Sequence, residues 1–197
     1  IGGKVNYKKT IINILLLSMI QLIICPSVLQ AKESNEAIKL ELIKELVTDH
    51  GFDEQYITAV FEKATYLPKI INLISKPAEK TKTWNEYRRI FVTPARIAAG
   101  VIFAKQHEQL LLKAAQETGV PVDIILGILG VETYFGRIQG NFKVIDSLYT
   151  LVTGYPPRSA FFKEQLINLF YLAREQGIAI EEIKGSYAGA MGASQFI

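Results

Sequence analysis

The sequence is poor in the residues that build metal and redox sites: its 197 residues include one cysteine, Cys25, and two histidines, His50 and His107. Both histidines are isolated in the sequence, so we expect no zinc or other metal site. A glycine-rich phosphate loop and the Gly-x-Ser-x-Gly turn of α/β hydrolases are also missing from the sequence. These absences argue against a zinc enzyme, a P-loop nucleotide-binding protein and a serine hydrolase of that class.

The basic excess is confined to the beginning of the chain. Lysine and arginine number 22 against 19 acidic residues, a formal net charge of +3, but residues 1–31 hold Lys4, Lys8 and Lys9 and no acidic residue. The rest of the chain is therefore balanced, with 19 basic and 19 acidic residues. A nucleic-acid partner is not expected, because binding to phosphates depends on a basic surface.

Residues 1–31 are typical of an export signal. The three lysines precede an apolar run over residues 11–24, and we predict cleavage after Ala31. The run is shorter than the roughly 20 apolar residues of a membrane span, although an uncleaved anchor helix is the alternative. Cys25 stands where a lipoprotein signal carries its lipidated cysteine, but Ile24 fits poorly directly before it. We expect a signal peptide or a lipoprotein signal, and a protein that works outside the cytoplasm.

The remaining chain is predicted to be mainly α-helical. Apolar residues recur at helical spacing, with start signals such as Thr93-Pro94 and stop signals such as Gly119 and Gly177. The composition, 49% hydrophobic and 21% charged, suits one domain with a real core. No strand-like alternation or internal repeat is visible. We predict helices over residues 35–47, 53–66, 69–74, 93–118, 121–136, 144–152 and 159–176, a polar linker over 75–83 and a glycine-rich loop from 185 onward.

One carboxylate, Glu132, lies inside an apolar helical stretch, residues 128–136. An ionised carboxylate among aliphatic and aromatic groups is costly, so it either finds a partner or keeps its proton. A carboxylic acid that keeps its proton can donate it to a leaving oxygen, and the adjacent Tyr134 and Phe135 offer flat surfaces for sugar rings. The alternative is a helix-end carboxylate that faces solvent or pairs with Arg137 or a more distant arginine.

No second acid in this region is equally unusual. A conventional glycosidase needs two carboxylates about 5 to 9.5 Å apart. Asp123 and Asp146 each lie in the first turn of a predicted helix, where they interact with the helix dipole. Glu164 belongs to an amphipathic helix rich in surface charge. The region therefore offers one candidate catalytic acid.

The glycine-rich segment over residues 184–196 is a second candidate for ligand binding. Its small residues allow the backbone to approach a ligand, and Ser186 and Gln195 can hydrogen-bond hydroxyl or acetamido groups. The alternative is a flexible loop. An aromatic and basic cluster further upstream is more often a packing feature than a binding site; its members are Trp84, Tyr87, Arg88 and Arg89.

The pairing of residues 130–136, Gly-Val-Glu-Thr-Tyr-Phe-Gly, with residues 184–192, Lys-Gly-Ser-Tyr-Ala-Gly-Ala-Met-Gly, resembles the membrane-bound lytic murein transglycosylase B family. The likeness covers roughly residues 40–197. It also includes residues 91–94 (Phe-Val-Thr-Pro), 155–156 (Tyr-Pro) and 195–196 (Gln-Phe). Two long motifs in the right order make the resemblance specific.

The resemblance implies a lysozyme-like helical catalytic domain, with residues 32–197 as its N-terminal portion. It implies cleavage of the β-1,4 bond between N-acetylmuramic acid and N-acetylglucosamine in peptidoglycan. Glu132 matches the glutamate that protonates the glycosidic oxygen and then takes a proton from the muramoyl C6 hydroxyl, giving a 1,6-anhydro product. The resemblance further implies a monomer in the periplasm, soluble or anchored to the outer membrane, that needs no cofactor.

The same resemblance implies substrate contacts at five positions. Ser186 and Gln195 match positions that contact substrate, Ser186 through the acetamido group, and Tyr187 is placed beside them. Tyr87 matches an aromatic lining position, and Arg158 matches a basic position in the groove. This chain has Pro157-Arg158 where relatives can carry two adjacent arginines. The missing arginine puts contacts to anionic peptide or muramoyl groups in doubt, but not the chemistry.

Relatives continue well past the Gln-Phe motif, into further cleft residues and, in some, a calcium loop. We therefore expect residues 32–197 alone to be inactive or unstable, with calcium binding possible only in a part not present here. Two alternatives stay open for the function. One is a muramidase that uses water and a second carboxylate, and the other is a non-catalytic protein that binds the cell wall.

Overall fold

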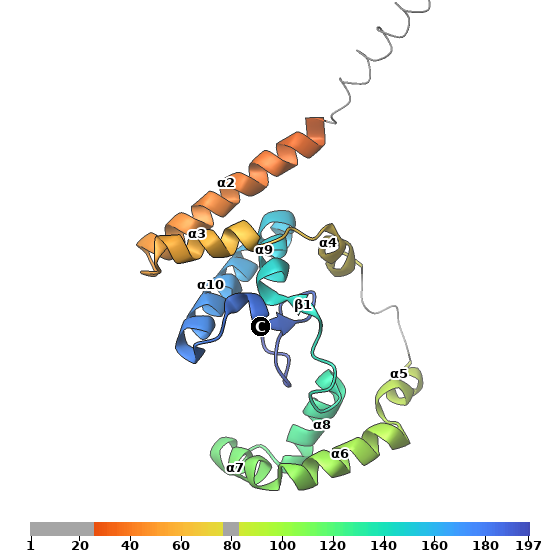
Figure 1. The fold of residues 1–197 in the computed structure, drawn as a ribbon. Coiled ribbons are helices and arrows are strands. Elements are labelled where there is room, and N and C mark those ends of the chain that lie inside the picture. Colours follow the sequence, from red (N-terminus) through yellow and green to blue (C-terminus); the bar gives the residue numbers. More distant parts are fainter. Residues whose placement is uncertain (1–25, 77–82) are drawn as a thin grey trace, which may run out of the picture.

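The computed structural model describes residues 26–76 and 83–197, and this part of the chain is mainly helical, as predicted (Figure 1). The predicted signal falls mostly on residues 1–25, outside the described residues, while residues 26–31 begin the first described helix. In chain order the elements are α2 (Pro26–Thr48), α3 (Glu54–Lys63), α4 (Pro68–Ile74), α5 (Trp84–Phe91), α6 (Pro94–Gln106), α7 (Glu108–Thr118), α8 (Val122–Thr133), β1 (Phe142–Lys143), α9 (Val144–Gly154), η1 (Pro156–Arg158), α10 (Ser159–Gln176), η2 (Ile180–Glu182) and β2 (Lys184–Gly185).

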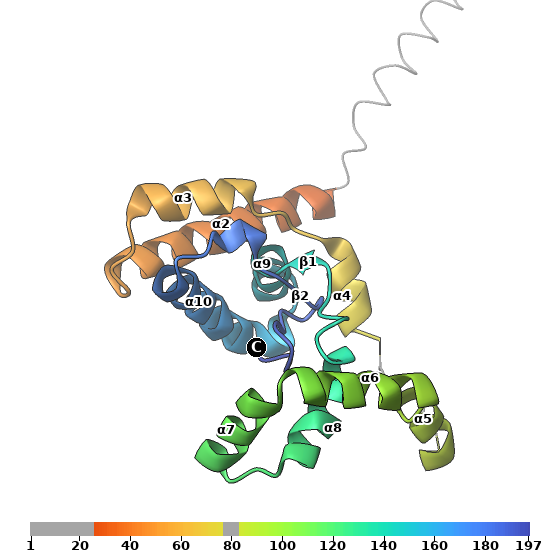
Figure 2. The same ribbon diagram turned by 60° about the horizontal axis from the view of Figure 1, so that its bottom comes forward.

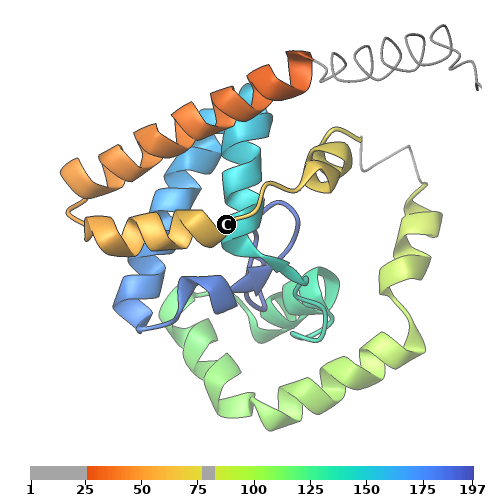
Figure 3. The same ribbon diagram turned by 45° about the horizontal axis from the view of Figure 1, so that its top comes forward.

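Helix α9 is the centre of the hydrophobic core. All nine residues from Val144 to Val152 are buried, so this helix is enclosed on every side. Helices α2, α3, α4 and α10 surround it (Figures 1 and 3). Phe61, Phe162 and Phe170 fill the largest fully buried positions around it. We call α2, α3, α4, α9 and α10 the core lobe.

The polar residues of α9 fix the connection between α3 and α4. Asp146 Oδ1 accepts the amide proton of Thr65 at 2.8 Å, and Thr150 Oγ1 accepts that of Leu67 at 2.9 Å. Leu67 precedes α4 and has no side chain that can cap it, so Thr150 supplies the cap from another helix. Asp146 was predicted to serve the dipole of its own helix. It does lie in the first turn of α9, and its carboxylate in addition holds a neighbouring turn, which is a structural role.

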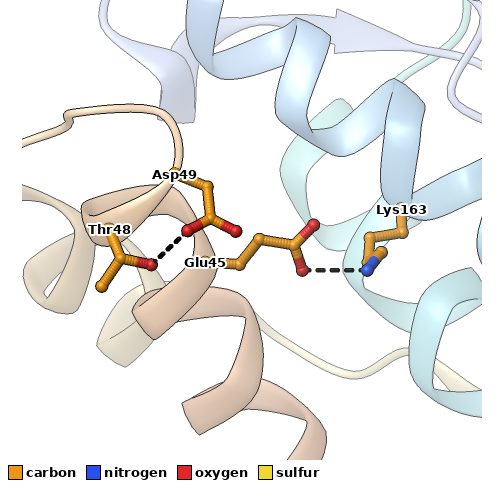
Figure 4. A network of polar contacts seen from close by, with 4 residues as sticks. All are labelled: Glu45, Thr48, Asp49 and Lys163. Atoms are coloured by element: carbon orange, nitrogen blue, oxygen red, sulfur yellow. Dashed lines mark hydrogen bonds and ion pairs between the residues drawn. The ribbon is translucent and has the colours of Figure 1, made fainter.

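An ion pair joins the first and last helices of the core lobe. Lys163 Nζ on α10 lies 2.9 Å from Glu45 Oε2 on α2, and both side chains are partly buried (Figure 4). Next to this contact, Thr48 Oγ1 donates to Asp49 Oδ1 at 2.6 Å, where α2 ends. The ion pair holds α2 against α10 close to the turn that leads to α3.

Helices α5 to α8 form a separate arc that curves away from the core lobe (Figures 1 and 2). Seven aliphatic side chains of this helical arc are between 50% and 65% exposed: Ile97, Val101, Ile102, Leu110, Leu112, Ile124 and Ile128. Within residues 26–76 and 83–197, no single helix has the length and apolarity to cross a membrane. Helices α7 and α8 taken together are long and apolar enough, by length and composition alone, but they are bent by 111° relative to each other.

In the arc, one predicted helix was wrong and one helix was missed. The helix predicted over 93–118 is broken at His107, whose ring lies 4.4 Å from that of Phe103, and the break turns α7 back onto α8. Helix α5 was missed altogether. Glu86 reaches back to the amide of Thr83 at 2.8 Å, so the Thr-x-x-Glu pattern of a capping box was present in the sequence.

Several predicted boundaries also differ. Helix α2 begins nine residues before the predicted Asn35, α3 ends at Lys63 and α8 ends at Thr133 instead of Gly136. Ser159 is not the cap of α10, because its hydroxyl donates to Val152 O at 2.7 Å. The antiparallel pair of β1 and β2 was missed, since two residues per strand are too few for an alternation to be visible.

Candidate active site

Glu132 is the penultimate residue of α8, and its side chain is exposed. The prediction of a carboxylate enclosed by apolar groups was wrong, because the neighbouring Ile128 and Val131 are themselves 50% and 41% exposed. In the part of the chain that the structure describes, Glu132 makes no hydrogen bond or ion pair. The carboxylate is therefore free to meet a ligand, and the pairing with Arg137 considered from the sequence does not form.

Helix α8 ends in a left-handed turn of three residues directly after Glu132 and Thr133. Tyr134, Phe135 and Gly136 have φ values of 53°, 59° and 79°. Two bulky residues in this conformation cost on the order of 1–2 kcal/mol each. Such a turn persists only where surrounding contacts hold it, and strain of this kind is concentrated at functional sites.

The ring of Phe135 is one of those contacts, because it lies between two glycines. A methyl group added at Gly100 of α6 would lie 2.7 Å from Phe135 Cζ, and one added at Gly130 of α8 would lie 2.9 Å from it. Both distances are shorter than real contacts between carbons. The missing side chains of the two glycines therefore make the space in which Phe135 is held.

Thr133 joins the end of α8 to the glycine-rich segment. This residue is fully buried, and its hydroxyl donates to Ala193 O at 2.6 Å and accepts the amide proton of Gly136 at 2.9 Å. Further contacts come from two glutamines. Gln139 Nε2 donates to Gly136 O at 2.8 Å, and Gln195 Nε2 donates to Gln139 O at 3.3 Å. The two motifs singled out in the sequence thus meet in space.

Ser186 organises the glycine-rich segment. Its Oγ accepts the amide protons of Ala188 at 3.2 Å and Ala190 at 3.1 Å, while Ser147 Oγ of α9 donates to Ser186 O at 3.3 Å. The segment begins at β2, and the backbone of Gly185 approaches that of Gly140 so closely that a side chain at Gly140 would collide with it. These contacts connect the segment to α9 and to the backbone at Gly140.

Of the other three predicted site residues, Tyr187 follows Ser186 in the glycine-rich segment, whereas Tyr87 and Arg158 lie on other elements. Tyr187 is half-buried against the core lobe. Tyr87 is an exposed residue of α5, with its ring 6.3 Å from that of Trp84 and 4.8 Å from that of Phe91. Arg158 is exposed in η1, with its guanidinium 4.3 Å from the centre of the Phe161 ring. Gln195 and Thr133, the residue after Glu132, take part in the junction, and Ser186 lies in the same glycine-rich segment. Tyr87 and Arg158 stand on separate elements.

The sequence did not single out Thr133 or Gln139, although both hold the junction together. A buried threonine next to a candidate acid is a weak signal, because its partner Ala193 lies sixty residues away. The cavity of about 630 Å³ in the core lobe, lined by residues that include Phe61, Tyr66 and Tyr149, does not include Glu132. The candidate acid itself is exposed in the described chain.

Comparison with known proteins places this chain in a family. Residues 34–197 match the transglycosylase SLT domain. The chain is 37% identical over 166 residues to the membrane-bound lytic murein transglycosylase B of Escherichia coli strain K12, covering 80% of this chain and 46% of that protein. The resemblance inferred from the motifs is thereby confirmed.

Two solved structures share the fold. The soluble lytic transglycosylase SltB1 of Pseudomonas aeruginosa is 44% identical with a TM-score of 0.77, over 80% of this chain and 53% of that one. Pseudomonas aeruginosa SltB3, solved in complex with NAG-anhNAM-pentapeptide, is 26% identical with a TM-score of 0.74, over 83% and 43%. The predicted lysozyme-like helical fold is confirmed. The chain spans about half the length of these relatives, and it belongs to the transglycosylase SLT domain family.

Proposed function

We propose that this chain provides the catalytic carboxylate of a lytic transglycosylase that cleaves the β-1,4 bond between N-acetylmuramic acid and N-acetylglucosamine in peptidoglycan. The observation that carries the proposal is the position of Glu132, which is exposed and unpaired beside a strained turn anchored to the glycine-rich loop. Membership of the family and the anhydromuramoyl compound bound to a relative support this class of reaction.

In the first step the protonated Glu132 acts as a general acid. It gives its proton to the glycosidic oxygen as the bond from this oxygen to C1 of the muramoyl residue breaks. The electron pair of that bond goes to the leaving oxygen, which becomes the hydroxyl of N-acetylglucosamine. Positive charge develops at C1, and Glu132 is now a carboxylate.

In the second step the same carboxylate acts as a general base. It takes the proton of the muramoyl C6 hydroxyl as that oxygen bonds to C1, which gives the 1,6-anhydro product and restores the acid. One residue can serve both steps because the base needed second is the one formed first. No water is consumed, so no second carboxylate is needed to position one.

The exposure of Glu132 is compatible with this role if the glycan itself covers the site. Ile128 and Val131 beside it are exposed, and a sugar placed over them would displace water from the carboxylate. Loss of water favours the neutral form of a carboxylic acid. The substrate would thus help to create the surroundings in which the acid keeps its proton.

The proposed substrate contacts follow from the free hydrogen-bonding groups at the junction. Ser186 Oγ accepts two amide protons, so its own proton can be donated to the carbonyl oxygen of an acetamido group. Gln195 keeps its side-chain carbonyl oxygen as an acceptor while its Nε2 holds the loop. We assign Tyr187, Tyr87 and Arg158 to more distant contacts along the glycan, Tyr87 by stacking and Arg158 by its charge.

The proposal extends to the place of action. A peptidoglycan substrate and the predicted export signal both favour the periplasm, with either a soluble or a lipid-anchored protein. The protein is expected to act as a monomer without a cofactor. The relatives include both a membrane-bound and a soluble enzyme by name, so either arrangement is compatible with the family.

The product of digestion tests the proposal. Purified peptidoglycan is treated with the whole protein to which this chain belongs, and the released fragments are analysed by mass spectrometry. Muramoyl ends lighter by one water than the reducing sugar are expected. Reducing ends that carry the added water would identify a hydrolase, and release of no fragments together with retained binding to peptidoglycan would identify a wall-binding protein.

A further inference from the structure

Arg96 stands out among the side chains around the candidate active site. It lies in the first turn of α6, where its amide donates to Thr93 Oγ1 at 3.2 Å. Its guanidinium carbon lies 5.1 Å from the centre of the Phe91 ring and 4.8 Å from that of Tyr134. In the described part of the chain, its Nη1 is buried and has no hydrogen-bond partner.

This arrangement is unfavourable for a residue whose only task is stability. A buried donor without an acceptor loses its interactions with water and gains none in return, and the loss is larger for a charged group. The contacts with the two rings offset part of that loss. An apolar side chain of similar length would fill the same space without the unpaired donor, so the guanidinium calls for another explanation.

Tyr134 supplies that explanation, since it begins the strained turn two residues after Glu132. Its ring contacts a second guanidinium, that of Arg137, at 5.2 Å. If Tyr134 and Phe135 adopted the right-handed conformation, α8 would continue and Thr133 would lose its contacts with Gly136 and Ala193. Glu132 would then lie inside a longer helix, separated from the glycine-rich loop.

We propose that Arg96 is a positioning residue for Glu132: its guanidinium, between the rings of Phe91 and Tyr134, holds the left-handed turn that presents the carboxylate beside the glycine-rich loop. This inference rests on the proposed function, because it gives Glu132 the catalytic role. Arg96 does not touch the substrate in this account. Its effect passes through Tyr134 and the backbone of the turn.

The decisive variant is Arg96→Met, which keeps the length of the side chain and removes the charge and the unpaired donor. We expect kcat to fall about ten- to a hundredfold, because small displacements of a catalytic group are costly, while KM and the thermal midpoint stay close to those of the parent. Arg96→Lys, which keeps the charge, is expected to recover part of kcat. Arg89→Met, an exposed arginine of α5, serves as the matched control.

Unchanged kcat in Arg96→Met would overturn the proposal. So would a loss of activity that merely follows the fraction of unfolded protein, or one that appears in KM alone. A double variant, Arg96→Met with Tyr134→Leu, is expected to lose little more kcat than either single variant, since both remove the same contact. Fully additive losses would show that Arg96 does not act through Tyr134.

A measurement independent of activity separates this proposal from the proposed function. In Arg96→Met, we expect the amide resonances of Tyr134, Phe135 and Gly136 to shift and the exchange of the Gly136 amide to become faster, because this amide donates to Thr133. Unchanged resonances and exchange would refute the positioning role even in an active enzyme. If the parent protein fails to cleave peptidoglycan but the turn loosens as expected, the failure lies with the proposed function alone.

Discussion

The core lobe and the helical arc bury their residues to very different extents. Helix α9 has nine buried residues in succession, and α10 has six buried residues along one side of its length. In the arc, α5 has no buried residue, α6 and α7 have one each, and α8 has only Gly130 and Thr133. The hydrophobic free energy that stabilises the described chain is therefore concentrated in the core lobe.

Backbone strain is distributed the opposite way. The non-glycine residues with positive φ among those described are Tyr134, Phe135 and Gln195, all at the junction of the arc with the glycine-rich loop. Glu132 directly precedes Thr133 of this junction, and Ser186 lies in the glycine-rich loop. The stable part and the candidate active part of this chain are therefore separate, so substitutions in the two should have separable effects.

The largest expected effect is the loss of activity in Glu132→Gln. The amide can neither give nor take the proton, so release of anhydromuramoyl fragments should fall by about two to four orders of magnitude. Because Glu132 is exposed and makes no hydrogen bond or ion pair in the described chain, the free energy of unfolding should change by less than about 0.5 kcal/mol. Mass spectrometry of the digest and urea unfolding measure the two quantities.

Glu164→Gln is the matched control for that variant, since Glu164 is an exposed carboxylate on α10. It should retain both activity and stability. Equal activity in Glu132→Gln and the parent would show that Glu132 is not catalytic. The helical arc would then not carry the active part of the chain.

Truncation of a core side chain should have the next largest effect. Phe170 is fully buried against Phe52 and Phe61, so Phe170→Ala is expected to cost about 3–5 kcal/mol of unfolding free energy. Ile128→Ala on the arc removes a half-exposed side chain and should cost no more than about 1 kcal/mol. Urea unfolding of both variants gives the difference, and similar losses would show that the arc is as well packed as the core lobe.

The same contrast explains what could be predicted from the sequence. Elements delimited by local signals were predicted well: Asp53 caps α3, Thr93 and Pro94 begin α6, and Gly119 and Gly177 end α7 and α10 in the left-handed conformation. Each of these residues acts on the helix turn next to it in the chain, so the local sequence is enough to predict where the helix begins or ends.

The surroundings of the candidate site could not be predicted in this way. The strained turn depends on Phe135 fitting between Gly100 and Gly130, which come from two different helices. The anchor of the glycine-rich loop depends on Thr133 reaching Ala193. The apolar sequence around Glu132 suggested burial, but that apolar surface lies on the arc and is largely exposed. Hydrophobic composition shows that a residue can be buried, and only the packing of other elements decides whether it is.

Two glycines of α8 offer a sharper test of how the arc holds its strained turn. Replacing a glycine inside a helix by alanine normally stabilises it by about 0.5–1 kcal/mol. Gly127→Ala should do so, because its added methyl group meets nothing within 4 Å. Gly130→Ala should instead destabilise by about 1–3 kcal/mol, because the ring of Phe135 would collide with the methyl group and is prevented by Gly100 from moving away.

Thermal unfolding and digestion of peptidoglycan give the two readouts for this pair. Loss of activity should accompany Gly130→Ala and not Gly127→Ala, because only the former disturbs the turn after Glu132. Equal stabilisation by both substitutions would mean that Phe135 is not held between the two glycines.

The smallest expected effect concerns an ion pair at the edge of the core lobe. Lys63 Nζ lies 3.1 Å from Glu181 Oε1, where the end of α3 meets η2. The pKa of Glu181 is lowered from its usual 4.5, first by a hydrogen bond from its own backbone amide and second by the hydrogen bond from Lys63. Because a lowered pKa favours the folded state only while the carboxylate is ionised, this stabilisation is complete above pH 4.5 and is lost as the pH falls through the folded-state pKa.

Lys63→Met removes the second of these causes and leaves the first. The lysine is largely exposed, so the variant should lose only about 0.2–1 kcal/mol of unfolding free energy at pH 7, and less at high salt. The difference between variant and parent should shrink as the pH falls below 4.5, since protonated Glu181 no longer attracts a cation. Urea unfolding at several pH values measures it, and a difference that stays constant into acid would assign the effect of Lys63 to packing of its aliphatic stem instead of its charge.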